Sequence, residues 1–395
     1  MRKLAIAVMT VLAAFASVLL GSGAVQASNA PATITHLDLS GVSCASATFC
    51  AAVGERDETG SPSNVLPLAE IWNGARWRRT AVSIPKGWSQ GDLDSVSCTS
   101  PAYCVAVGTY GGNGISYAMA QTWNGRAWTV TVLPQLPHSH VLADSVSCGA
   151  PRHCATSMAS RPMPPGNRVF VDVLSGTTWH VHAMSLPKDV ELALPSAISC
   201  ASATYCVLTG EYYRQDGAGA AFATWNGQRL APMTASAYPA YFWSLSCPST
   251  THCAAAGELF GGLTDWGYVG VRNGGTWIAA RVAQPHAIVV TDLIGVSCAA
   301  PNRCLAVGYL RDRQPVNGTY PDRATAVFYN GKTWTRLNVP FPAGSRDTAF
   351  QSVSCLSVTR CVAVGLVAPG SHVFSNHSAF TGFWNGTSWR TVPAS

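Results

Sequence analysis

Cysteine spacing is the feature that most narrows the folds open to this chain of 395 residues. Its 14 cysteines form seven pairs, and five residues separate the two cysteines of every pair. The pairs are Cys44/Cys50, Cys98/Cys104, Cys148/Cys154, Cys200/Cys206, Cys247/Cys253, Cys298/Cys304 and Cys355/Cys361. The first cysteines of successive pairs lie 54, 50, 52, 47, 51 and 57 residues apart. This spacing predicts seven tandem repeats of about 50 residues each.

Two chemistries compete for these cysteine pairs. Zinc sites use other ligand spacings, and seven identical zinc sites in one protein would be unusual. An even cysteine count at one short spacing favours a disulfide that closes a tight turn between two strands. We therefore predict one disulfide within each of the seven pairs, no metal site and no cofactor. The loop-entropy model gives about 2 kcal/mol of stability for each such bridge.

Two sequence patterns flank the cysteines in most repeats. A Ser-Val-Ser stretch precedes the first cysteine, as at residues 95–97, and an Ala-Val-Gly stretch follows the second, as at residues 106–108. About 20 residues later comes Trp-Asn-Gly-x-x-Trp, as at Trp72…Trp77, Trp123…Trp128 and Trp384…Trp389. Asn-Gly between apolar strands indicates a hairpin with a type I′ turn.

Each repeat therefore reads as four short antiparallel strands, A to D. Strands A and B carry the cysteine pair, and strands C and D flank the Asn-Gly turn. Tandem four-stranded units of this length are typical of β-propeller blades, and a closed ring leaves no exposed sheet edge between units. We predict an all-β fold, a seven-bladed β-propeller with one C-x5-C disulfide per blade, as a single domain over residues 28–395.

The first 27 residues form a predicted signal peptide. Arg2 and Lys3 precede an apolar run over residues 4–20, and small residues stand at Val25-Gln26-Ala27 for cleavage after Ala27. An uncleaved N-terminal anchor is the alternative. We expect a secreted, extracellular protein with no membrane span after cleavage, in an oxidising compartment where disulfides persist.

Charge argues against nucleic acid as a partner. Only 11% of the residues are charged, and the net charge of +6 is spread along the sequence. Nucleic-acid binders concentrate Lys and Arg on one face or in one segment. We expect no nucleic-acid partner, a monomer, and a glycan or a cell-surface protein as the ligand.

Loop variation indicates which face of the ring binds a ligand. The A–B and C–D turns lie on one face of a propeller, here called the turn face, and they vary little between repeats. The B–C and D–A connections lie on the other, the loop face, and they vary in length and composition. Function on repeat scaffolds is found where the loops differ, so the loop face is the candidate binding face.

Aromatic and charged side chains near these connections are the candidate ligand-binding residues. Most tryptophans belong to the Asn-Gly hairpins, but three lie in or beside the variable connections. The ligand-binding candidates are Trp88, Tyr212, Tyr213, Tyr241, Trp243, Trp266, Arg311 and Arg313. Aromatic rings stack on sugars and dominate interface energetics. The alternative is that these rings plug the central channel or pack between blades, and that the arginines form a solvated mixed surface with neighbouring Asp residues.

Glutamates supply the candidate catalytic residues. The sequence has six Glu, and Glu55, Glu211 and Glu258 all follow the Gly that ends strand B. Glu211 and Glu258 belong to adjacent repeats beside the aromatic residues, so they are candidates for the carboxylate pair of a glycoside hydrolase. The alternative is that both are solvated loop carboxylates.

The repeat resembles the BNR/Asp-box group of secreted propellers, which includes sialidase-like, sortilin-like and photosystem II assembly-factor-like proteins. The resemblance rests on Ala306-Val307-Gly308 and on Gly-x-Thr/Ser-Trp stretches such as Gly331-Lys332-Thr333-Trp334. It implies a β-propeller over nearly the whole mature protein. The family's Asp, two residues before that Gly, is replaced in all seven repeats, for example by Trp72 and Trp384.

Three functions follow from these observations. The first is a secreted propeller that binds a carbohydrate or a cell-surface protein through the loop face. The second is a glycoside hydrolase or lyase that uses Glu211 and Glu258. The third is a structural exported scaffold. The sequence favours a binding protein over an enzyme and does not identify the ligand.

Overall fold

The computed structural model describes residues 36–57, 65–112, 114–135, 140–161, 168–187, 189–215, 217–231, 234–235, 240–260, 264–285, 287–313, 320–342, 344–368 and 377–393. All of them belong to the compact unit Thr33–Ser395. The signal peptide predicted at residues 1–27 lies outside these residues. Every regular element in the described part is a β-strand, which confirms the all-β prediction. None of its elements is a helix with the length and hydropathy needed to span a membrane.

Hydrogen bonds join the described strands into six sheets. The first contains β1 (His36–Ser46), β2 (Phe49–Asp57), β3 (Val65–Trp72) and β4 (Trp77–Thr80). The second contains β5 (Gln90–Gly91), β6 (Ser95–Ser100), β7 (Tyr103–Gly112), β8 (Ile115–Trp123) and β9 (Trp128–Val132), with β5 and β6 both paired to β7. The third contains β10 (His140–Ala150), β11 (His153–Arg161), β12 (Arg168–Ser175) and β13 (Thr178–Ser185).

The remaining sheets continue the same strand order. The fourth contains β14 (Leu192–Ser202), β15 (Tyr205–Arg214), β16 (Gly217–Trp225) and β17 (Thr234–Ala235). An eight-stranded sheet contains β18 (Tyr241–Ser246), β19 (His252–Phe260), β20 (Asp265–Asn273), β21 (Thr276–Arg281), β22 (Ile288–Ala300), β23 (Arg303–Asp312), β24 (Asp322–Tyr329) and β25 (Trp334–Leu337). The last contains β26 (Asp347–Ser357), β27 (Arg360–Ala368), β28 (Ser378–Trp384) and β29 (Trp389–Pro393).

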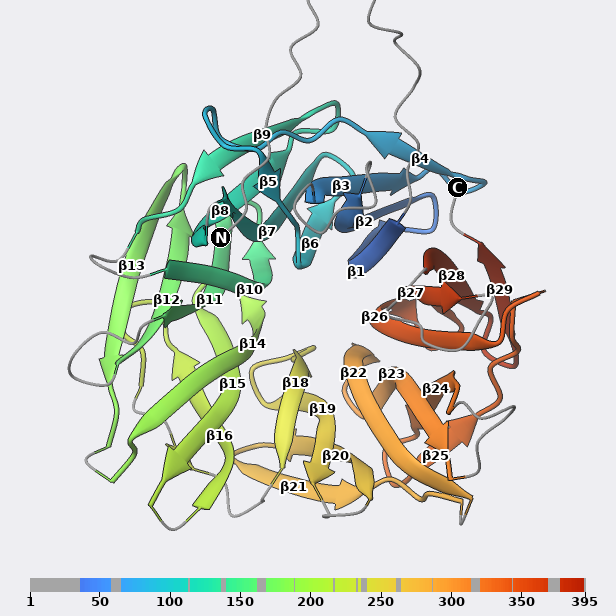
Figure 1. Ribbon diagram of the computed structural model, residues 1–395. Coiled ribbons are helices and arrows are strands. Elements are labelled where there is room, and N and C mark those ends of the chain that lie inside the picture. The colour runs from blue at the N-terminus through green and yellow to red at the C-terminus, as the bar shows by residue number, and fades with distance from the viewer. Residues whose placement is uncertain are drawn as a thin grey trace, which may run out of the picture. The chain divides into compact units, whose positions relative to one another are not determined.

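These sheets form a β-propeller with antiparallel blades. Strands β1, β6, β14, β18, β22 and β26 lie nearest the centre, and β4, β9, β13, β21, β25 and β29 lie at the rim (Figure 1). The first and last sheets pack against each other, with Leu39 and Val42 in one buried cluster with Val364 and Ala379. Each of these two sheets is built from one continuous stretch of sequence. Closure therefore rests on packing rather than on an exchanged strand.

All seven predicted disulfides are present. Each closes the turn between strand A and strand B, and in six of them the two cysteines face each other in register, as Cys44 does with Cys50. The other six are Cys98–Cys104, Cys148–Cys154, Cys200–Cys206, Cys247–Cys253, Cys298–Cys304 and Cys355–Cys361. Because the bridged residues are only six positions apart, every disulfide fixes one hairpin and none links two sheets.

Serine side chains make the connection from one disulfide hairpin to the next. The backbone N–H of Cys98 donates to Ser43 Oγ at 2.9 Å. Equivalent bonds of 2.8–3.0 Å run from Cys148 to Ser97, Cys200 to Ser147, Cys247 to Ser199, Cys298 to Ser246, Cys355 to Ser297 and Cys44 to Ser354. The bond from Cys44 to Ser354 closes the series between the last and first sheets. The Ser-Val-Ser stretch is thus an inter-sheet hydrogen-bond device.

The Asn-Gly hairpins differ from the predicted type I′ turn. Trp72 pairs directly with Trp77, so four residues form the loop. Asn73 Oδ1 accepts the backbone N–H groups of Ala75 and Arg76, both at 3.0 Å. Of the two turn residues only Gly74 has a positive φ, of 95°. The type I′ prediction was wrong because the Asn amide oxygen caps the loop, so that Asn73 needs no positive φ.

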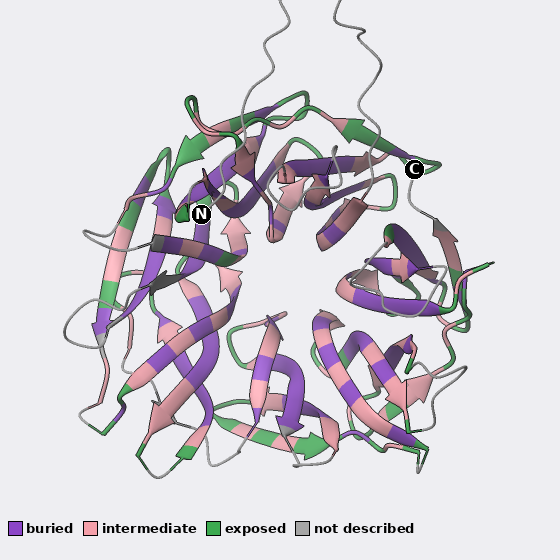
Figure 2. Ribbon diagram, in the orientation of Figure 1, coloured by how far each residue is buried: buried purple, intermediate pink, exposed green. Residues whose placement is uncertain are grey.

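The hydrophobic core is divided among the contacts between neighbouring sheets. Ala51, Val53 and Ala69 of the first sheet form one buried cluster with Leu93 and Met119 of the second repeat. Similar clusters lie at the following contacts around the ring. Strands such as β7 and β15 are therefore buried along most of their length, whereas the rim strand β9 is largely exposed (Figure 2). Apolar burial between sheets is the main favourable term for the ring.

Candidate functional site

A β-bulge in the innermost strand places the central residue of the site. In β18 the register with β19 shifts between Phe242 and Ser244, which leaves Trp243 as the inserted residue. A bulge bends the strand and re-aims the inserted side chain. Tyr241, just before the bulge, pairs with Glu258. The rings of Tyr241 and Trp243 lie nearly parallel, with centroids 6.1 Å apart and 18° between their planes.

A glycine makes the close pairing at this position possible. Gly257 precedes Glu258 and faces the backbone of Tyr241, whose carbonyl oxygen occupies the place of a Cβ. Any other residue would push β18 and β19 apart. Gly257 therefore sets the position of Glu258. The prediction that this Gly ends strand B was wrong, because β19 continues to Phe260.

Glu211 reaches the same region from the neighbouring sheet. The Tyr213 hydroxyl donates a hydrogen bond to Glu211 Oε2. That bond, with burial, raises the pKa of Tyr213. Burial and the charge of Glu211 also raise the pKa of Tyr241, which places Glu211, Tyr213 and Tyr241 within electrostatic reach of one another. The exposed fraction of Glu211 is 8%.

Glu258 lies among other acidic groups. Its exposed fraction is also 8%, and burial together with the charges of Asp292, Asp265 and Glu211 raises its pKa to about 8. Burial and Asp265 raise the pKa of Asp292 to about 7. The Trp243 indole N–H is close enough to both carboxyls to lower these pKa values, but it makes no hydrogen bond of standard geometry to any described residue. At neutral pH Glu258 therefore keeps its proton.

We call Glu211, Tyr213, Tyr241, Trp243, Glu258 and Asp292 the loop-face cluster. The strand ends that carry it lead into the B–C and D–A connections, so it lies on the loop face. Tyr309 borders the cluster, since it pairs with Asp292 and its pKa is raised by burial and by the Asp292 charge. The cluster combines aromatic faces, hydroxyl and indole donors and carboxyl groups. That set can stack on a sugar ring and bond its hydroxyls.

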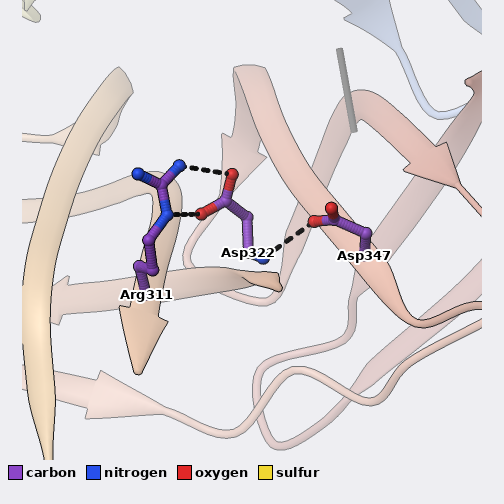
Figure 3. A network of polar contacts seen from close by, with 3 residues as sticks. All are labelled: Arg311, Asp322 and Asp347. Atoms are coloured by element: carbon purple, nitrogen blue, oxygen red, sulfur yellow. Dashed lines mark hydrogen bonds and ion pairs between the residues drawn. The ribbon is translucent and has the colours of Figure 1, made fainter. Parts of the chain in front are cut away.

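Arg311, a predicted ligand-binding residue, is engaged within the fold. Its Nε and Nη2 donate to the two carboxylate oxygens of Asp322 at 2.8 and 2.9 Å, and Asp347 Oδ1 accepts the backbone N–H of Asp322 at 2.8 Å (Figure 3). This bond to Asp322 raises the pKa of Arg311 further. The network ties β23 and β24 to β26 rather than presenting a free cation. Arg313 is exposed and its guanidinium has no partner among the described residues.

The remaining predicted residues lie apart from the loop-face cluster. Trp88 packs edge-on against Tyr110 and Tyr117, with centroid distances of 5.8 and 5.3 Å. Trp266 donates to Thr264 Oγ1 at 3.1 Å and lies under Arg281 at 5.2 Å, within the contact to the fourth sheet. The Cζ atom of Arg214 lies 4.8 Å from the ring centroid of Tyr212, and Tyr212 packs against the buried cluster between the third and fourth sheets.

Sequence reasoning missed the aspartates of the innermost strands. Asp292 stands six residues before the first cysteine of its repeat, the position that Asp38 and Asp92 occupy in the first two. Asp38, Glu55, Asp92, Asp94 and Asp144 form a second acidic group, in which burial raises the pKa of Asp38 to about 7 and that of Asp94 well above its usual range. Aligning the repeats on their cysteines would have revealed this position.

No group of three or more His, Cys, Asp or Glu within the described ranges has an arrangement suited to a metal ion. Two cavities lined by described residues lie apart from the loop-face cluster. One of about 790 Å³ lies between the first and last sheets, and one of about 570 Å³ lies beside β24 and β25.

Comparisons with known proteins give the fold. No family model and no curated protein matches the sequence. Among solved structures, the GH74 xyloglucanase from Xanthomonas campestris aligns with a TM-score of 0.55 at 12% identity, over 91% of this protein and 55% of that one. YCF48 from Cyanidioschyzon merolae aligns with a TM-score of 0.51 at 13% identity, over 84% and 94%.

A third similar structure is Sqt1 from Chaetomium thermophilum, bound to the N-terminus of ribosomal protein L10. It aligns with a TM-score of 0.50 at 9% identity, over 89% of this protein and 86% of that one. At these identities the likeness extends to the fold and no further. The protein is similar to known β-propellers.

Proposed function

We propose that the ring has seven blades. The support is the series of seven Ser–Cys hydrogen bonds. Each bond connects one disulfide hairpin to the next, and the bond between Ser354 and Cys44 connects the last hairpin to the first. The eight-stranded sheet counts as two blades, because among the described residues the only strand pairing between its halves is the parallel bridge of Asp265 with Val290. The two halves also enclose a buried cluster of their own. The BNR/Asp-box resemblance remains a proposal that rests on the repeat motifs.

We propose that the protein is exported after cleavage of residues 1–27. Seven disulfides and no free cysteine fit an oxidising, extracellular environment. N-terminal sequencing of the protein recovered outside its cells tests this: a product starting at Ser28 is expected, and a product retaining Met1 would contradict it.

We propose that the loop-face cluster binds a saccharide. The observation that carries this is the parallel pair of Tyr241 and Trp243 between Glu211 and Glu258. Sugars present C–H faces that stack on aromatic rings and hydroxyls that need both donors and acceptors. Here protonated Glu258 is a donor, and Glu211 is an acceptor. Similar propellers include a xyloglucanase and a protein bound to a peptide, so the ring itself accommodates both ligand classes.

A glycan array on the oxidised mature protein tests the proposal. The expected result is specific binding that Trp243→Ala abolishes and that Tyr241→Ala weakens at least tenfold, as expected for loss of a stacking hot spot. The matched control is Trp266→Ala, because Trp266 lies outside the cluster and its loss should leave the glycan profile unchanged. The proposal would be contradicted if the protein bound no glycan, or if Trp266→Ala lost as much binding as Trp243→Ala. Either result would favour a protein partner or a structural scaffold.

Glycoside hydrolysis is the second candidate, and the raised pKa of Glu258 favours it. A general acid must hold its proton at working pH, as Glu258 does beside Glu211. Hydrolysis of a bound oligosaccharide should fall by at least about 100-fold in both Glu258→Gln and Glu211→Gln while the affinity persists. If the unmodified protein binds the oligosaccharide but does not hydrolyse it, the hydrolase candidate is rejected and saccharide binding remains.

A further inference from the structure

A cavity on the turn face lies away from the loop-face cluster. It occupies the contact between the first and last sheets and has a volume of about 790 Å³, within the range of ligand sites. Its lining includes Trp72, Thr359, Arg360, Phe383 and Asn385, and it contains no Asp or Glu. We call it the seam pocket.

One residue position distinguishes the seam from three of the other sheet contacts. The residue before the second cysteine is Phe49, Tyr103 or Tyr205 in three other repeats, and each of these rings packs into the cluster between its sheet and the next. In the last repeat the position holds Arg360, which is exposed and has no partner among the described residues. The space that an aromatic ring fills elsewhere is left as a pocket with a free guanidinium.

The tryptophan of the seam pocket also differs from its counterparts. The indole N–H groups of Trp123 and Trp384 donate to the carbonyls of Pro101 and Val358, both at 3.1 Å. Trp72 is half-buried, and its N–H has no acceptor in the part of the sequence described. Its ring lies 5.0 Å from that of Phe383, with 46° between the planes. The two rings form an apolar wall that also offers an unused donor.

The pocket offers donors beside the hydroxyls of Ser46, Ser357 and Thr359, which are engaged within their own turns. Asn385 Oδ1 accepts the backbone N–H groups of Thr387 and Ser388 at 2.9 and 2.8 Å, which leaves its Nδ2 to the pocket. With Arg360 and the Trp72 N–H, these donors match a ligand rich in acceptors. A sugar hydroxyl needs an acceptor as well as a donor, whereas a carboxylate with neighbouring peptide carbonyls needs donors only.

We propose that the seam pocket binds a peptide segment that presents a carboxylate beside an apolar side chain. The Arg360 guanidinium binds the carboxylate in a bidentate manner, and Trp72 and Phe383 contact the apolar side chain. The carboxylate belongs either to the C-terminus of the peptide or to an acidic residue within it. This site is separate from the saccharide proposal, and either stands if the other fails.

Three small probes distinguish the sources of the carboxylate. They are N-acetyl-leucyl-phenylalanine with a free carboxylate, the same dipeptide as its C-terminal amide, and N-acetyl-aspartyl-phenylalanine amide. Tryptophan fluorescence and calorimetry on the oxidised mature protein measure the affinities. Binding of the first probe alone identifies a C-terminus, and binding of the third identifies an acidic residue. Equal binding of the free acid and the amide, or no binding of any probe up to about 10 mM, overturns the proposal.

Variants locate the binding. Arg360→Gln should weaken the bound probe about tenfold or more, because a charge-assisted pair is lost. Trp72→Phe keeps the ring and removes the donor, so it should weaken binding less. The matched control is Arg303→Gln, at the same position of the preceding repeat, where the guanidinium donates to the carbonyls of Asn302 and Asn330. Unchanged affinity in Arg360→Gln, or an equal loss in Arg303→Gln, overturns the proposal.

Discussion

Protonation of Glu258 is the residue-scale property on which the saccharide site depends. Its pKa of about 8 means that the carboxyl group is a hydrogen-bond donor below that pH and an acceptor above it. A carboxylic acid beside the Trp243 indole and the Tyr241 ring offers a sugar hydroxyl a donor. Glu211, bonded to Tyr213, offers an acceptor on the other side.

Saccharide affinity should therefore fall with rising pH. Where the bound form requires protonated Glu258, affinity decreases by roughly tenfold per pH unit above about 8. Glu258→Gln keeps a donor that does not titrate, so its affinity should be flat from pH 6 to pH 9.5. Calorimetric titrations over this range check both expectations. An unmodified protein whose affinity does not change with pH would show that Glu258 does not donate to the ligand.

Asp172 is a buried carboxyl that the function does not use. Its exposed fraction is 0%, neither oxygen has a hydrogen-bond partner among the described residues, and burial raises its pKa to about 7. Between its unfolded pKa of about 4 and pH 7, the folded state keeps a proton that the unfolded state loses, so stability falls as pH rises. The loss is complete above pH 7 and amounts to at most about 4 kcal/mol.

Asp172→Asn should remove this penalty. The variant keeps the shape of the residue and cannot ionise, so it should be more stable than the parent at pH 8 and nearly equal to it at pH 4. Urea unfolding at the two pH values measures the difference. A variant that is equally destabilised at both would show that Asp172 has a partner that the amide cannot replace.

At the residue scale, sequence reasoning named five of the six residues of the loop-face cluster and missed Asp292. Glu211 and Glu258 stand at equivalent positions of adjacent repeats, and Tyr241 comes beside Glu258 through the pairing of β18 with β19. Trp266 was grouped with them by sequence proximity, but strand alternation turns it toward the opposite sheet contact. The bulge that leaves Trp243 inserted was not predictable from a period-two pattern, since a bulge interrupts that pattern.

At the scale of elements, the hairpin of strands A and B is the repeated building unit. The disulfide holds its turn, and the serine before the first cysteine bonds the next hairpin. A backbone N–H at this sheet contact that lost its acceptor would be costly, because water reaches it poorly. The motif Ser-x-Ser-Cys therefore forms part of strand A and also bonds the cysteine backbone of the next repeat.

Ser354→Ala tests the bond that closes the ring. It leaves the Cys44 N–H without its acceptor at the contact between last and first sheets and should cost about 1 to 2 kcal/mol of unfolding free energy. Ser100→Ala is the matched control, because Ser100 bonds only the nearby Ala102 N–H within an exposed turn, and its loss should cost less than about 0.5 kcal/mol. Equal effects in the two variants would contradict the closing role of Ser354.

Strand positions were predictable from the cysteine and tryptophan motifs, but the turn type was not. Asn-Gly signals a two-residue turn when both residues take positive φ. Here the amide oxygen of Asn73 instead accepts two backbone N–H groups, which lengthens the loop to four residues. The flanking Trp72 and Trp77 pair directly across the hairpin, and their ring centroids lie 5.6 Å apart.

At the scale of the whole molecule, the ring has two faces with different chemistry. The loop face carries partly protonated carboxyls and tyrosines, and the seam pocket on the turn face carries donors and a guanidinium. Sequence spacing predicted the ring and favoured the loop face. It did not predict the seam pocket, because that pocket needs the first and last repeats to be neighbours in space and an aromatic position to be replaced by Arg360.

The most direct measurement of the central claim is a crystal structure of the oxidised mature protein soaked with the oligosaccharide that the glycan array selects. The account predicts a sugar ring stacked on Tyr241 or Trp243, with a hydroxyl within hydrogen-bond distance of Glu211 or Glu258. A sugar bound at another place, such as the seam pocket, with no density at the loop-face cluster, would contradict the account.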